Sequence, residues 1–170
     1  YQALLNMVGD DATNGGHYNI AIGRSAMEGV NNDGHANCEQ DGNIAIGNTA
    51  LAGGTLAGDL DLVGNIAIGH NAMNATGTNA QTGTVAIGYD ALTALTTGVQ
   101  NTAVGYKALF DVVEGSNNTA LGYGAMGGTL GTTADGASNN VAIGHTAMGG
   151  TFYDTQTDGC IAIGYLALSG

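Results

Sequence analysis

The sequence predicts an all-β fold, a parallel β-roll or β-solenoid of about eight to nine short two-strand coils, forming one repetitive domain over residues 1–170. Three observations predict it: a nine-residue unit recurs along the chain, bulky and small residues alternate within it, and the segments between units vary in length. Residues 101–109 read NTAVGYKAL, for example, and residues 118–126 read NTALGYGAM. A constant unit with changing linkers indicates an array of stacked structural units.

Each unit is centred on an anchor glycine, and consecutive anchors lie 17 to 24 residues apart. Glycine suits a bend or a positive φ, where a Cβ atom would be unfavourable. A partial unit, Tyr-Gln-Ala-Leu at residues 1–4, matches the second half of the full ones. The anchors are Gly23, Gly47, Gly69, Gly88, Gly105, Gly122, Gly144 and Gly164.

The three residues before each anchor predict a β-strand. Alanine always stands two positions before the glycine, with Ile, Val or Thr before it and a large aliphatic residue after it. This period of two places the alanine on one face of a strand and its neighbours on the other. The β-branched residues and the central glycine argue against a helix. The alanines are Ala21, Ala45, Ala67, Ala86, Ala103, Ala120, Ala142 and Ala162.

The four residues after each anchor, such as 106–109, alternate in the same way and predict a second short strand, followed by a loop rich in Gly, Asn, Asp and Thr. If both alanine columns point inward, the roll is so narrow that only methyl groups fit, and the bulky columns face outward. Such an apolar stripe is too large to leave in water and predicts an obligate oligomer. The outward residues are the aliphatic residue before each anchor and Met27, Leu51, Met73, Leu92, Leu109, Met126, Met148 and Leu168.

Two further columns predict ladders along the stack. Identical amides on successive coils can hydrogen-bond to one another, and rings on stacked strands pack well. Lys107 is the one residue of its unit to which we assign no role. The Asn ladder comprises Asn19, Asn43, Asn65, Asn101, Asn118 and Asn140, and the ring column comprises Tyr1, His70, Tyr89, Tyr106, Tyr123, His145 and Tyr165.

The units NIAIGRSAM, NVAIGHTAM and NTAVGYKAL resemble the head repeats of trimeric autotransporter adhesins, the YadA-like head, and similar repeats in phage tail fibres. The resemblance covers essentially the whole chain. It implies a left-handed parallel β-roll, three chains around one axis and a role in surface attachment.

The charge balance, fourteen acidic residues against two basic ones, excludes most nucleic-acid partners and docking on anionic membranes. Most acids lie in the linkers, where a solvated surface is the simplest interpretation. A calcium site is the alternative, because Ca²⁺ takes oxygen ligands, although no EF-hand or nonapeptide motif is present. The weak candidates for it are Asp10, Asp11, Asp59 and Asp61.

The two cysteines, Cys38 and Cys160, are several coils apart, which places them beyond disulfide reach within one chain. They are expected to be free thiols, with an interchain bridge as the alternative. Asn74 and Asn117 begin weak N-x-[ST] glycosylation patterns. No stretch is apolar enough to predict a transmembrane helix.

No catalytic motif emerges, so we expect a non-enzymatic protein without a cofactor. The leading hypothesis is an extracellular, cell-surface or virion tail-fibre segment, a fragment of a longer fibre, whose variable loops attach to a surface receptor or glycan. A self-assembling filament, with rolls stacked head to tail or as a cross-β fibril, is the first alternative. A polysaccharide-cleaving fibre enzyme built on linker carboxylates is the second.

Overall fold

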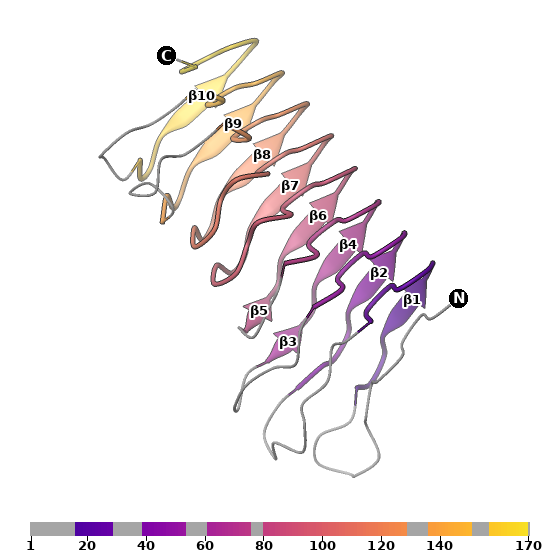
Figure 1. Ribbon diagram of the computed structural model, residues 1–170. Helices are drawn as coiled ribbons and strands as arrows, with labels where there is room; N and C mark the ends of the chain where they lie inside the picture. The colour runs from indigo at the N-terminus through magenta and orange to yellow at the C-terminus, as the bar shows by residue number, and fades with distance from the viewer. Residues whose placement is uncertain are drawn as a thin grey trace.

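The computed structural model describes residues 16–28, 39–53, 61–75, 80–128, 136–150 and 157–169. They form a parallel β-solenoid without a helix, in which successive coils stack along one axis (Figure 1). Accordingly, no helix of the described residues could span a membrane. The main sheet has eight strands, in the order β1 (Ile20–Ile22), β2 (Ile44–Ile46), β4 (Ile66–Ile68), β6 (Val85–Ile87), β7 (Thr102–Val104), β8 (Thr119–Leu121), β9 (Val141–Ile143) and β10 (Ile161–Ile163).

The strands of this sheet are parallel and in register. The central alanine of each strand pairs with the central alanine of the next, as Ala86 does with Ala103 and Ala103 with Ala120. These three alanines are fully buried, so the strand face predicted to point inward does so. A separate two-stranded sheet joins β3 (Leu62–Val63) to β5 (Gln81–Thr82), also in parallel.

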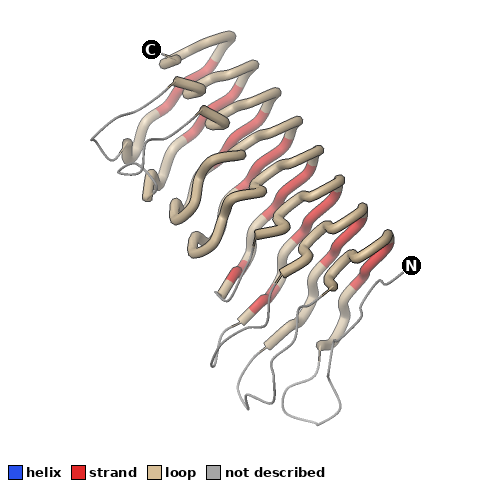
Figure 2. The backbone as a smooth tube through the Cα atoms, in the orientation of Figure 1, coloured by secondary structure: helices blue, strands red, loops and turns tan. Residues whose placement is uncertain are grey.

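The prediction of a second strand after each anchor glycine is wrong. The residues after each anchor glycine form turns, and the main sheet has one strand per unit (Figure 2). In the unit around Gly105, Lys107 and Leu109 have φ angles of 54° and 53°, and the equivalent residues of other units share this left-handed conformation. Non-glycine residues adopt it uncommonly, so an alternating apolar pattern gives no warning of it.

This turn geometry also corrects the predicted direction of the Met/Leu column. Met27, Leu51, Met73, Leu92, Leu109, Met126 and Met148 are fully buried, and of this column only Leu168, in the last unit, is half exposed. In a pleated strand, successive side chains point to opposite faces. The left-handed residue instead lets both Ala108 and Leu109 point inward. The interior is therefore filled with Met and Leu side chains, and is wider than one of methyl groups alone.

The outer surface of the main sheet is apolar, as the strand pattern predicts. Its side chains are the first and third residues of each strand, fourteen aliphatic residues and two threonines, and none is charged. They are exposed at the two ends of the sheet, at Ile22 and Ile163 for example, and half-buried between the ends except at Leu121, which is exposed. We call this surface the aliphatic face. Its members are Ile20, Ile22, Ile44, Ile46, Ile66, Ile68, Val85, Ile87, Thr102, Val104, Thr119, Leu121, Val141, Ile143, Ile161 and Ile163.

Candidate functional site

The anchor glycines hold the coils close together where the chain bends after each strand. Gly105 has a φ angle of 139°, a region that L side chains rarely adopt. A Cβ atom on Gly105 would clash with the carbonyl oxygen of Gly122 in the next coil. The same clash with the next anchor would arise at each of the first seven anchors, whereas Gly164 has open space around this position.

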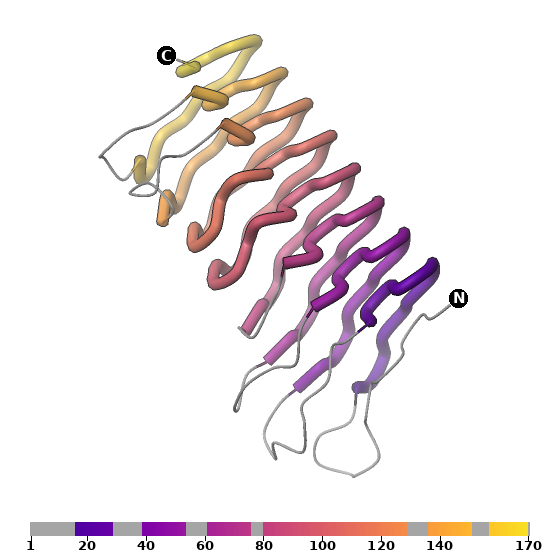
Figure 3. The backbone as a smooth tube through the Cα atoms, viewed as in Figure 1, coloured from indigo at the N-terminus to yellow at the C-terminus, as the bar shows by residue number. Residues whose placement is uncertain are grey.

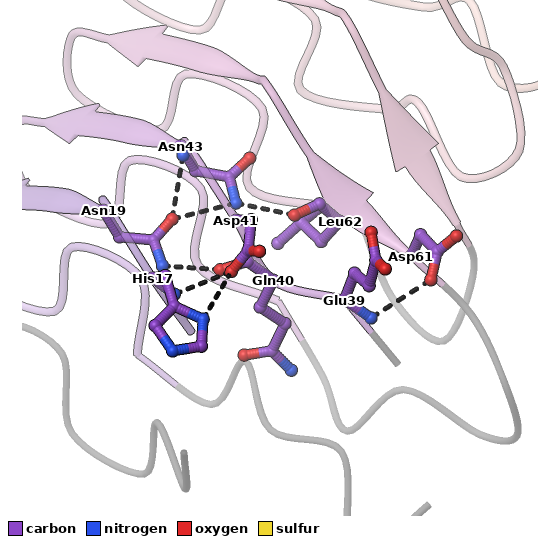
Figure 4. Close-up of polar contacts among 8 residues, drawn as sticks. All are labelled: His17, Asn19, Glu39, Gln40, Asp41, Asn43, Asp61 and Leu62. Atoms are coloured by element: carbon purple, nitrogen blue, oxygen red, sulfur yellow. Dashed lines mark hydrogen bonds and ion pairs between the residues drawn. The ribbon is translucent and has the colours of Figure 1, made fainter. Parts of the chain in front are cut away.

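The Asn column forms a hydrogen-bonded ladder inside the solenoid (Figure 4). The main-chain N–H of Asn43 donates to Oδ1 of Asn19 at 2.8 Å, and the Asn43 Nδ2 donates to the same oxygen at 3.1 Å. Nδ2 of Asn43 also donates to the carbonyl oxygen of Leu62. Asn65 repeats this arrangement with Asn43 and Gln81. Each buried amide thus ties its own coil to the previous one.

The ladder is interrupted at Thr84 and then resumes. The main-chain N–H of Thr84 donates to Oδ1 of Asn65 at 3.0 Å, but Oγ1 of Thr84 is buried without a hydrogen-bond partner. From Asn101 the amide pattern continues through Asn118 to Asn140. It ends at Cys160, whose main-chain N–H donates to Oδ1 of Asn140.

A second polar column, two residues before the Asn column, escaped the sequence analysis. A main-chain N–H in one coil donates to a side-chain oxygen of the next coil, from His17 to Asp41 at 2.7 Å and from Ser138 to Asp158 at 2.8 Å. Ser116 accepts from Val99 and donates to Ser138 in the same way. The recurrence of Asp or Ser at this position is the sequence signal that could have revealed it.

The residue between these two columns is left-handed in every described coil, which sequence reasoning also missed. Gly fills the position four times, which is the signal that could have indicated it. Asn117, one of the two glycosylation candidates, is among the others and is exposed. The residues, with φ angles of 59° to 70°, are Tyr18, Gly42, Gly64, Gly83, Gln100, Asn117, Asn139 and Gly159.

The calcium candidates gain no support from the described coils. Asp10, Asp11 and Asp59 lie outside the described residues. Oδ1 of Asp61 accepts a hydrogen bond from the main-chain N–H of Glu39 at 3.1 Å (Figure 4). Within the described ranges, no three His, Cys, Asp or Glu side chains gather in a metal-binding group. Asp61 therefore serves as a backbone acceptor here.

The ring column is a continuous exposed stack over six coils. Ring centroids are 4.8 to 5.4 Å apart from His70 through Tyr89, Tyr106 and Tyr123 to His145, with interplanar angles of 7° to 12°. Tyr165 continues the stack at 5.4 Å with a tilt of 41°. The four tyrosines remain 41% to 73% exposed. Tyr1, the remaining residue predicted for this column, lies outside the described residues.

The side chain of Lys107 lies beside two aromatic rings, a contact that the residues at the same position in other units did not predict. Its Nζ lies 4.6 Å from the centroid of the Phe110 ring and 5.7 Å from that of Tyr106. Both distances suit a cation–π interaction. Burial raises the pKa of the nearby Asp111 carboxyl, and the positive charge of Lys107 offsets part of that rise.

The cysteines add no chemistry to the described coils. Cys160 is a free, half-buried thiol at the end of the Asn ladder, and Cys38 lies outside the described residues.

No protein-family model, curated protein or solved structure matches this chain. The internal ladders are structural, since their amides are buried and occupied by coil-to-coil bonds. Two surfaces remain available to partners on the described coils, the aliphatic face and the ring column.

Proposed function

We propose that this chain is a non-enzymatic segment of an extracellular fibre, structural and adhesive, in which three copies pack around a common axis. The observation that supports this proposal best is the aliphatic face. It covers the outer side of all eight strands and is uncharged, and none of the described elements packs over it. A contiguous apolar surface of this kind marks an interaction site.

The apolar area of the face determines the hydrophobic contribution to association. Eight strands about 4.8 Å apart and roughly 10 Å wide present roughly 350 Å² of flat surface. Burying that area contributes about 9 kcal/mol per chain, which is of the same order as the cost of association. A stable assembly therefore needs every copy to bury its whole face against another.

Charge directs association to the same surface. The chain carries a formal net charge of −12, so copies repel one another over most of their surface. Acids of the second polar column, such as Asp41 and Asp158, precede the strands and lie outside the aliphatic face. Contact through the uncharged face brings copies together with the least like-charge repulsion.

Analytical ultracentrifugation of the purified chain tests this proposal. Three chains of 16.8 kDa give a particle of about 50 kDa. Ile87→Lys places a charge in the middle of the face and should yield monomers, while Gln100→Lys, on an exposed residue away from the face, should leave the trimer intact.

Other outcomes separate the alternatives. A stable, soluble monomer of the unchanged chain would overturn the proposal. Fibres of indefinite length in electron micrographs would favour the self-assembling filament. Shortening of a polysaccharide during incubation with the protein would favour the enzyme.

A further inference from the structure

The positive charge of this acidic chain is concentrated along the ring column. The sequence contains one arginine and one lysine. Arg24 directly follows its anchor glycine and thus occupies the ring-column position of the β1 coil, and Lys107 directly follows Tyr106. His70 and His145 are members of the column itself. The other described coils hold neutral residues at the Arg24 position, and at the Lys107 position they hold neutral residues or, in the β6 coil, Asp90, so the repeat itself does not require a cation at either place.

Neither cation forms an ion pair with a carboxylate in the described part of the chain, although Lys107 is near enough to Asp111 to lower the pKa of its carboxyl. The one ion pair found there joins His17 to Asp41, so neither Arg24 nor Lys107 has a described carboxylate oxygen within 4.0 Å. Asp90, which follows Tyr89, has Oδ1 occupied by a hydrogen bond from Nδ2 of Asn71 at 3.0 Å. Neither cation is thus held in an ion pair, although Lys107 also lies over the Phe110 ring.

The acids of the second polar column lie at the opposite end of the strands. Asp41 precedes β2 by three residues, whereas the ring-column position follows β2 and its glycine, at Asn48. The three-residue strand between them alone spans about 10 Å. This separation exceeds the screening length of about 8 Å at physiological ionic strength. An anionic partner on the ring column is therefore only weakly repelled by those acids. Each coil in Figure 3 bends sharply after its strand, and β3 and β5 lie toward the other edge.

The outward surface of the column consists of ring edges and hydroxyl groups. Rings stacked 4.8 to 5.4 Å apart cover one another's faces, so the exposed fraction of each tyrosine comes chiefly from its edge. A phenol hydroxyl both donates and accepts hydrogen bonds. The repeat of such groups along a straight line suits a linear polymer that carries many hydroxyl groups.

We infer that the ring column binds an extended acidic polysaccharide laid along the solenoid axis. The tyrosine hydroxyls and the histidine nitrogens would hydrogen-bond to sugar hydroxyls. Arg24 and Lys107 would pair with carboxylate or sulfate groups. Single-stranded nucleic acid fits less well, because its bases need free aromatic faces and its phosphates more than two cations. The inference rests on the adhesive part of the proposed function and names its ligand class and site.

Fluorescence anisotropy with labelled probes tests this inference on the full chain. The acidic probes are a hyaluronan decasaccharide and a chondroitin sulfate decasaccharide, and the comparison probes are neutral dextran and oligo-dT of similar size. Both acidic probes should bind, and binding should weaken between 50 and 300 mM NaCl. No binding of either acidic probe, equal binding of dextran, or tighter binding of oligo-dT would overturn the inference.

Variants connect the binding to the column. The double variant Arg24→Gln and Lys107→Gln should weaken acidic-probe binding about tenfold or more, since two charge-assisted contacts are lost. The matched control, Gln100→Glu with Asn117→Asp, lowers the net charge by the same two units at exposed positions off the column and should bind normally. Equal weakening in both would show that overall charge, and not the ring column, determines binding.

Sedimentation of the same samples keeps this result separate from the proposed assembly. If the chain is a trimer but binds no acidic probe, the ring-column inference is wrong and the proposed fibre assembly still stands. If the chain is a monomer that binds the acidic probes, the proposed trimer is wrong and the binding site still stands.

Discussion

Oδ1 of Asn101 accepts two hydrogen bonds from Asn118, one from its main-chain N–H at 2.9 Å and one from its Nδ2 at 3.1 Å. Nδ2 of Asn118 also reaches the carbonyl oxygen of Ala137, so this amide links three coils. Replacement by a residue that cannot form these bonds leaves buried polar groups without partners, which costs about 1–3 kcal/mol each.

We expect Asn118→Ala to lower the free energy of unfolding by about 3 kcal/mol or more, because it removes four hydrogen bonds of the side chain, two donated by Nδ2 and two accepted by Oδ1 from Asn140. Urea denaturation followed by circular dichroism measures this change. Asn117→Ala, at the exposed neighbouring residue, is the control and should cost less. Equal losses in the two variants would contradict a structural role for the ladder.

Thr84→Asn should raise stability by about 1 kcal/mol, the typical net contribution of a hydrogen bond. The Oδ1 atom of an asparagine at this position would accept hydrogen bonds from Asn101, as the other ladder amides do, and would join the two halves of the ladder. Thr84→Val, which removes the unpartnered hydroxyl without adding an amide, should be neutral or slightly stabilising. A thermal melt in which the Asn variant unfolds below both the Val variant and the parent chain would refute the expectation.

Leu109→Ala and Leu168→Ala test the corrected direction of the Met/Leu column. Leu109 is fully buried and Leu168 is 50% exposed. Truncating the buried leucine should cost about 3 kcal/mol, and truncating the exposed one much less. Chemical denaturation of the two variants gives the difference. Similar small losses would indicate that the column faces outward, as the sequence alone suggested.

The anchor glycines offer a matched pair. Gly105→Ala introduces a Cβ atom that clashes with Gly122, while Gly164→Ala meets no atom within 4 Å. Both carry the cost of a positive φ, about 1–3 kcal/mol. We therefore expect Gly105→Ala to be clearly the more destabilising of the two, as measured by midpoint of unfolding. A reversed order would show that coil spacing adapts to the methyl group.

Asp111 should make stability fall with rising pH. Burial raises the pKa of its carboxyl in the folded state above the unfolded value of 3.8, so the folded state binds the proton more tightly. Stability from this group is therefore greatest below pH 3.8 and is lost as pH rises through the folded-state pKa. Asp111→Asn should melt at a higher temperature than the parent chain at pH 7, with the gap closing at pH 3. A gap independent of pH would contradict the assignment.

The strand before each glycine was predictable, because alternation of Ile, Ala and Ile has one simple interpretation in a repeated unit. The in-register alanines, the Asn ladder and the stacked rings followed from columns that repeat one residue type. The turn after each glycine was not predictable from the same logic. Residues such as Met73 and Leu109 adopt a left-handed backbone, which aliphatic side chains rarely do.

The polar contacts of Asp41, Asp158 and Ser138 were also missed, because they occupy a column in which the residue type varies. Lys107 has no equivalent in the other coils, so its contact with Phe110 required coordinates. Columns that repeat one residue type thus predicted the contacts that recur from coil to coil, whereas contacts that occur in a single coil became visible only in the structure.

The interruption at Thr84 has a mechanical consequence. Coil-to-coil hydrogen bonds such as those of β6 and β7 run along the solenoid axis, so a pull on the two ends loads every junction in series. The tensile strength of a series is that of its weakest link. The junction after Thr84 lacks the Asn-to-Asn bonds present between Asn101 and Asn118, and the one side-chain amide bond across it that the structure shows runs from Nε2 of Gln81 to the carbonyl oxygen of Thr96, so we expect a stretched rod to part there first.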